Sequence, residues 1–78
     1  SRRIVTSPRV LENKQPGLAW RLRLSLEAAP RLDCVGFGFA ELAPLTEAPV
    51  DLAFQVAVDE YLGHQRVGLK LKALQATP

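Results

Sequence analysis

Residues 18–26 alternate large apolar side chains with small or charged ones. Leucine or tryptophan stands at every even position of this stretch, and arginine occupies positions 21 and 23. Because successive side chains of a β-strand point to opposite faces of a sheet, this period-two pattern predicts a strand with one apolar and one cationic face. Arg21 and Arg23 are expected to face outward. The side chains expected in a core are Leu18, Trp20, Leu22, Leu24 and Leu26.

Proline, glycine and short polar runs divide the rest of the chain into further predicted strands. No stretch between the turns has the length and period of a full helix. Pro44 is expected to end a single helical turn that begins at Ala40. The predicted strands cover residues 3–13 with a bend at Ser7-Pro8, and residues 18–27, 31–39, 50–59 and 66–74.

Five short strands, each with one apolar face, predict an all-β fold. The break between the third and fourth strands favours a five-stranded Greek-key barrel, the OB-fold. An SH3-like barrel is the alternative, because strand number alone does not separate the two. Beyond the first stretch, the expected core consists of Val35, Phe37, Phe39, Val50, Leu52, Phe54, Val56, Val58, Val67, Leu69 and Leu71.

The third strand can face in either of two ways. If Phe37 and Phe39 face inward with Val35, its outer surface is a shallow floor formed by Cys34 and the glycines at 36 and 38. In the opposite facing, the two phenylalanines lie outside as stacking platforms for nucleic-acid bases. We expect the first arrangement, since phenylalanine is among the residues most often buried.

The composition indicates one folded domain. Hydrophobic residues make up 47% of the chain and charged residues 23%, which is ordinary for a globular protein. No apolar run reaches the roughly 20 residues that a membrane-spanning helix needs. The chain contains no methionine. We expect residues 1–78 to be a single domain of a larger multidomain enzyme that is cytoplasmic and makes no membrane contact.

Few residues suit catalysis or metal binding. The single cysteine, Cys34, and the single histidine, His64, have no partners at the spacing of a metal site. Neither Ser7 nor Ser25 has the glycine-flanked setting of a hydrolase nucleophile. We therefore expect no catalytic residue and no cofactor in this chain.

The ten basic and eight acidic residues are unevenly distributed. Residues 1–31 carry a net charge of +5, residues 32–65 a net charge of −6, and the last 13 residues a net charge of +3. In a small barrel, such blocks are expected to give one basic and one acidic side. The basic side favours an anionic partner such as nucleic acid, and the acidic block offers a surface for a protein.

Five motifs follow one another along the chain: Arg21-Leu22-Arg23-Leu24-Ser25-Leu26, Val35-Gly36-Phe37-Gly38-Phe39-Ala40, Val50-Asp51-Leu52-Ala53-Phe54, Asp59-Glu60-Tyr61-Leu62-Gly63 and Val67-Gly68-Leu69-Lys70-Leu71. In order and spacing they resemble the OB domain of the RecJ family. RecJ proteins are bacterial exonucleases of the DHH phosphoesterase superfamily that degrade single-stranded DNA from 5′ to 3′. The resemblance covers roughly residues 9–74.

The resemblance implies a non-catalytic OB domain that guides single-stranded DNA to a catalytic core elsewhere in the parent exonuclease, in DNA repair and recombination. That core would hold manganese or magnesium through DHH motifs, which this chain lacks. The implied partners are single-stranded DNA, the other domains of the parent, and single-stranded-DNA-binding protein or other repair proteins. The alternative function is a docking module that packs on the catalytic domains or on another repair protein.

Candidate DNA-binding residues come from two strands and two loops. In an OB barrel the third strand lies between the second and the fifth, so Arg21 and Arg23 would flank it on one side and Lys70 and Lys72 on the other. Such rows fit a phosphate backbone, although exposed cations also occur as plain solvated surface. Four phosphate contacts to a single strand would give a slope of log affinity against log salt of about −3. The loops add Lys14, Arg66 and Tyr61, of which Tyr61 is a candidate base stacker.

Overall fold

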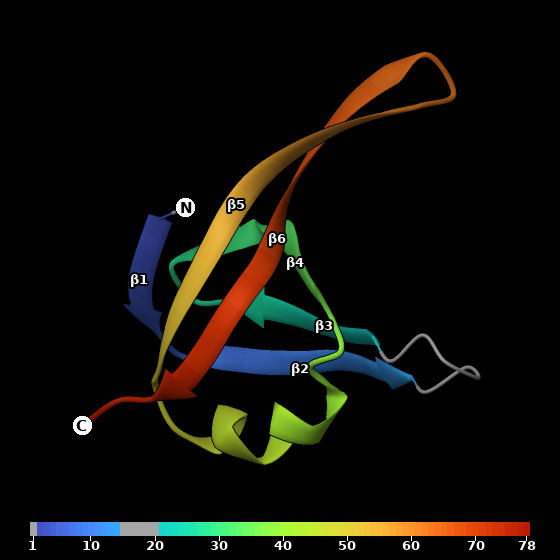
Figure 1. Ribbon diagram of the computed structural model, residues 1–78. Helices are drawn as coiled ribbons and strands as arrows, with labels where there is room; N and C mark the ends of the chain where they lie inside the picture. The colour runs from blue at the N-terminus through green and yellow to red at the C-terminus, as the bar shows by residue number, and fades with distance from the viewer. Residues whose placement is uncertain (1, 15–20) are drawn as a thin grey trace.

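The computed structural model describes residues 2–14 and 21–78 and consists mainly of β-structure (Figure 1). The all-β prediction is confirmed. Leu18 and Trp20, two of the expected core residues, lie outside the described residues. The elements in chain order are β1 (Arg2–Thr6), β2 (Pro8–Lys14), β3 (Arg21–Leu26), β4 (Ala29–Phe37), the 3₁₀ helix η1 (Ala40–Glu47), β5 (Val50–Tyr61) and β6 (His64–Ala76).

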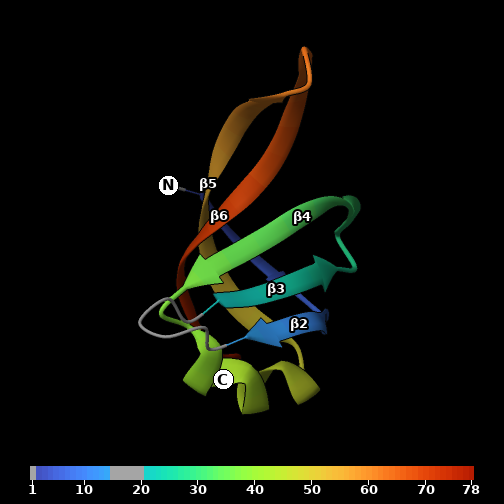
Figure 2. The ribbon, with the colours of Figure 1, turned by 90° about the vertical axis from the view of Figure 1, so that its right-hand side faces the viewer.

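The six strands form one sheet in the order β1-β5-β6-β4-β3-β2. Neighbours pair antiparallel, except that β4 and β6 pair in parallel at Cys34 with Leu69 and at Val35 with Lys70. As predicted, the third of the expected strands, β4, lies between the second, β3, and the fifth, β6. The sheet curls so that β4, β3 and β2 lie in front of β5 in Figure 2.

The sixth strand arises because the predicted first strand is divided at Ser7. Pro8 has no backbone N–H, which suits a break in a strand. Two hydrogen bonds connect the bend to the turn after β3. The amide of Ala28 donates to Oγ1 of Thr6, and the amide of Glu27 donates to the carbonyl of Ser7, each at a distance of 3.0 Å. Counted as one bent strand, β1 and β2 give the five-stranded Greek-key order of the OB type. The sheet itself is open among the described residues, because its two edge strands, β1 and β2, do not pair with each other.

The core lies where the apolar faces of β3, β4, β5 and β6 meet. Leu22, Leu24 and Leu26 are fully buried, which confirms the facing predicted for β3. Phe39 and Phe54 pack against the core while remaining partly exposed. The buried cluster consists of Leu22, Leu24, Leu26, Cys34, Val50, Leu52, Leu69, Leu71 and Leu74.

The helix η1 continues past Pro44 to Glu47, so the prediction that Pro44 ends it was wrong. The hydroxyl of Thr46 donates a hydrogen bond of 2.6 Å to the carbonyl of Ala43, and Leu42 and Leu45 pack against the core. This packing keeps the short helix in place despite the donor that Pro44 lacks. Within the described parts of the chain, no helix has the length and apolar character needed to cross a membrane.

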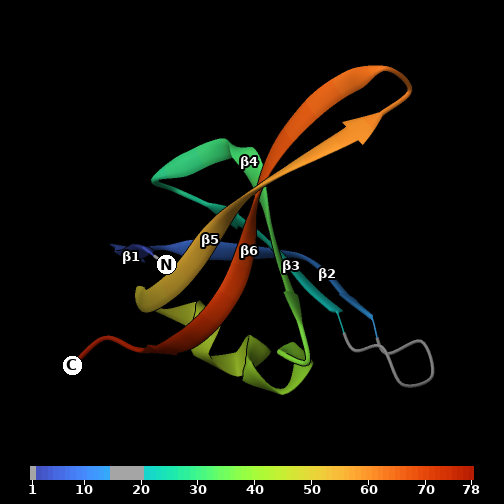
Figure 3. The same cartoon turned by 45° about the horizontal axis from the view of Figure 1, so that its top comes forward.

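Strands β5 and β6 extend well beyond the core as a two-stranded hairpin (Figures 1 and 3). We call residues 56–68 the hairpin arm. It ends in a two-residue turn in which Leu62 has φ 50° and Gly63 has φ 78°, the signs that a type I′ hairpin turn requires. Val56, Val58 and Val67 were predicted in the core but are exposed, because β1 pairs with β5 only as far as Phe54 and no described element covers the arm.

Candidate nucleic-acid interface

An open concavity of about 840 Å³ lies between the outer face of β3 and β4 and the hairpin arm. Five of the seven candidate DNA-binding residues line it. Val35 and Phe37 of β4 also line it, as do the carboxylates Asp33, Asp59 and Glu60. The candidates brought together here are Arg21, Arg23, Arg66, Lys70 and Tyr61.

Strand pairing explains why these side chains share one face. Arg21 lies opposite Phe37 and Arg23 opposite Val35 in the antiparallel pair of β3 and β4. Val35 in turn lies opposite Lys70 in the parallel pair of β4 and β6. Residues that are directly paired project to the same side of a sheet. Val35 is therefore flanked by Arg23 on one side and by Lys70 on the other.

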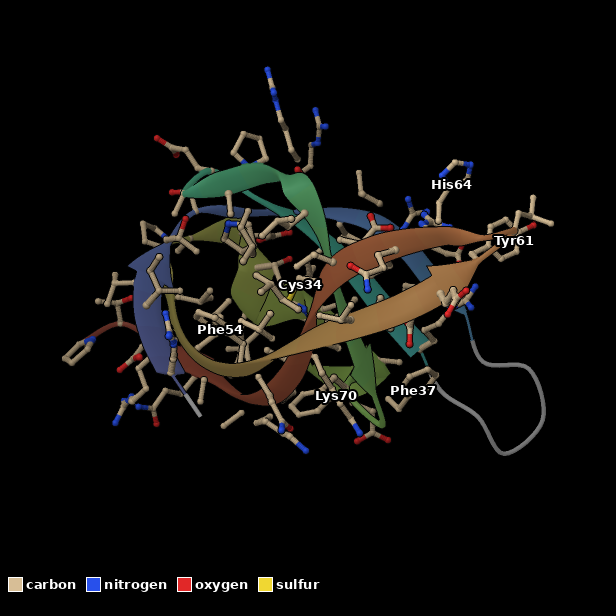
Figure 4. The ribbon with its side chains drawn as sticks, turned by 90° about the horizontal axis from the view of Figure 1, so that it is seen from above. Cys34, Phe37, Phe54, Tyr61, His64 and Lys70 are labelled. Carbon is tan, nitrogen blue, oxygen red and sulfur yellow. The ribbon has the colours of Figure 1, made fainter. Side chains whose placement is uncertain are left out.

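The facing predicted for β4 was wrong. Cys34 and Gly36 point into the core, whereas Phe37 is 60% exposed and lies outside the ring of strands in Figure 4. The reason is space: a Cβ atom at Gly36 would lie 2.7 Å from Cδ2 of Leu71 and 2.8 Å from the ring of Phe39. Only a residue without a side chain fits that inner position, so its neighbours Val35 and Phe37 face outward.

Phe39 does not share the facing of Phe37, although the two lie two positions apart in the chain, where strand side chains normally share a face. Gly38 between them has φ 80°, a left-handed conformation that ends the regular alternation of β4. The chain turns there toward η1, and Phe39 packs partly buried against the core. One of the two phenylalanines is thus a core residue, as expected, and the other is a surface aromatic.

Both arginines of β3 are already paired with carboxylates. Arg21 forms an ion pair with Glu12 of β2, and Nη2 of Arg23 lies 3.2 Å from Oδ1 of Asp33 on β4. Nε of Arg23 donates a hydrogen bond of 3.2 Å to the same oxygen. These pairs lie on the half-exposed outer face, where ion pairs are individually weak.

The expected division into one basic and one acidic side does not match these contacts. Asp33 and Asp51 belong to the acidic block, yet they pair with Arg23 and Arg3 of the basic block. The hydrogen bond that Arg3 donates to Asp51, at a distance of 2.5 Å, lowers the pKa of Asp51 below its usual value. Strand pairing thus interleaves the two charge blocks.

Arg66 and Lys70 have no ion-pair partner within residues 2–14 and 21–78. The guanidinium carbon of Arg66 lies 5.6 Å from the ring centroid of Tyr61, a cation–π distance. Tyr61 is 58% exposed near the end of the arm (Figure 4). The arm therefore presents an aromatic ring and a cation together.

Of the candidates whose side chains are described, one does not join the others. Lys72 is exposed but does not line the concavity. It lies at the point where the pairing of β5 with β6 shifts by one residue, between Ala53 and Phe54, and it has no partner in the register. The side chain of Lys14 lies outside the described part of the structure. His64 is exposed beside the hairpin turn, opposite Tyr61, as a polar turn residue.

Sequence reasoning missed Phe37 and Val35 as surface residues of the site. The available signal was Gly36, because a strand glycine marks a close approach of other atoms. Cys34 is a core residue with a free thiol, and burial raises the pKa of that thiol to about 11. The described residues contain no group of three or more histidine, cysteine, aspartate or glutamate side chains that suits a metal ion.

Comparison with known protein families, with curated proteins and with solved structures gives no match for this chain.

Proposed function

We propose that this chain is a non-catalytic, single-stranded DNA-binding OB domain of a RecJ-type exonuclease, which guides DNA to a metal-dependent catalytic core outside this chain in repair and recombination. The order of the five motifs and the OB-type order of the strands support the proposal. OB domains bind oligonucleotides on the face of their second and third strands and between the adjoining loops. The concavity lies on that face, over β3 and β4 and beside the arm.

The observation that carries the proposal is the exposed ring of Phe37 beside cations of β3 and β6. Single strands bind where aromatic rings stack on bases and cations follow the backbone. Among the described residues, Phe37 and Tyr61 are the exposed rings that line the concavity, and Arg21, Arg23 and Lys70 lie on the same face. Stacking and phosphate contacts do not distinguish base sequences, so binding should be sequence-tolerant.

The test is fluorescence anisotropy of a labelled DNA strand of about 15 nucleotides, longer than the site of a typical OB domain. The chain should bind, and R21E/R23E should abolish binding. Because glutamates at these positions would face Glu12 and Asp33, R21Q/R23Q serves as the milder variant. The matched control is R2E/R31E, which changes the charge equally at exposed residues outside the concavity. No binding by a folded wild-type chain at low salt would refute the proposal.

A second candidate function is a docking module that packs on the catalytic domains of the parent enzyme. The hairpin arm favours this function, because three large apolar side chains are exposed on it and a partner protein could bury them. These side chains are Val56, Val58 and Val67. Under this function, the isolated chain binds no DNA, and its association with the catalytic domains survives R21E/R23E.

A further inference from the structure

We infer that the carboxylates of Asp33 and Glu12 compete with phosphate for the two arginines of the concavity, so that they limit its affinity and its dependence on salt. The inference rests on the proposed function and deepens it. It assigns a regulatory role in binding to two residues that have the wrong charge for contacting DNA.

Asp33 stands where a phosphate would approach. It lines the concavity, its side chain is 41% exposed, and its Oδ1 accepts a hydrogen bond from Nε of Arg23 and lies 3.2 Å from Nη2 of the same guanidinium. A guanidinium offers carboxylate and phosphate oxygens the same donors in the same planar fork. A phosphate that takes these two donors must therefore displace Asp33.

Glu12 holds the second arginine in a similar way. Its carboxylate accepts from Nη2 of Arg21 and is more deeply placed than Asp33, with 21% of the side chain exposed. Nε of Arg21 is buried and has no hydrogen-bond partner among the described residues. Arg21 is thus held from one side by a carboxylate of β2, while β4 supplies the carboxylate that holds Arg23.

Competition of this kind has a signature in the salt dependence of binding. The slope of log affinity against log salt counts the counterions released, about 0.7 for each phosphate neutralised on a single strand. A phosphate that displaces a carboxylate leaves that anionic group unpaired beside the DNA, so the net negative charge around the strand hardly falls and little net counterion release follows. Only Arg66 and Lys70 lack ion pairs among the described cations of the concavity. The slope should then be about −1.4, instead of about −3 for four free cations.

The experiment compares wild type with D33N by anisotropy of the same 15-nucleotide strand at several salt concentrations. D33N should bind about fivefold more tightly, the upper end of what an exposed ion pair is worth. Its salt slope should be steeper by about 0.7, the value of one further phosphate contact. Adding E12Q should steepen it by about the same amount again. The matched control is D51N, which removes the same charge from a carboxylate paired with Arg3, outside the concavity.

The outcomes separate this inference from the proposed function. If wild type binds and D33N is no tighter, or if D51N gains as much as D33N, the inference is overturned while the proposed function stands. If neither wild type nor D33N binds at low salt, the proposed function is overturned as well. D33S provides a second neutral variant, and circular dichroism of each protein verifies that it is folded.

Discussion

Replacement of Phe37 by alanine should weaken DNA binding strongly while leaving the fold almost intact. The ring is 60% exposed, and its position opposite Arg21 makes a cross-strand contact its main structural contribution, worth about 0.2–1 kcal/mol. Stacking of one base on an aromatic ring is worth about 1–3 kcal/mol, so the loss of the ring should weaken binding roughly 5- to 160-fold.

The assay is the same anisotropy titration, combined with urea unfolding to measure the free energy of unfolding. F37W should retain binding, since indole also offers a flat ring for a base. V5A is the control, because Val5 is 58% exposed, lies on β1 and does not line the concavity. Unchanged affinity of F37A, with V5A equal to wild type, would show that no base stacks on this ring.

Two further predictions concern the core beneath the site. G36A should lower the free energy of unfolding by about 1–3 kcal/mol, because the added Cβ would lie 2.7 Å from Leu71 and 2.8 Å from the ring of Phe39, and urea unfolding measures this loss. Unaltered stability would contradict the close packing at Gly36. Burial raises the pKa of the Cys34 thiol from 9.0 to about 11, so the thiol stays protonated in the folded chain at a pH at which the unfolded chain ionises. Stability should therefore be lost progressively between about pH 9 and pH 11, and C34A should lack this component when the two unfolding free energies are compared across that range.

The sequence predicted β3 well because its alternation is strict and local. Leu22, Leu24 and Leu26 are buried, and Arg21 and Arg23 lie on the opposite face, as the period of two requires. The same pattern at Val56 and Val58 predicted a core that is absent there. Alternation identifies side chains that share a face, but it does not say whether another element covers that face.

The parts of the site that escaped prediction depend on contacts between distant residues. The facing of β4 follows from the space that Leu71 and Phe39 occupy around Gly36, and the third strand offered two phases of similar apolar content. The ion pair of Arg23 depends on strand register, which places Asp33 of the adjacent strand β4 diagonally next to it. Net charge along the chain contains no information on that register.

The two residue pairs between β4 and β6 also divide the molecule into two blades, one of β1, β5 and β6 and the other of β2, β3 and β4. Between the blades, the ladder of backbone hydrogen bonds is confined to that short seam, while the chain itself crosses at Ser7 and through η1. The concavity spans the seam, with Arg23 and Phe37 on one blade and Lys70 and Tyr61 on the other. A DNA strand that contacts both blades would connect them. Its binding should therefore slow amide hydrogen exchange first at residues 34, 35, 69 and 70.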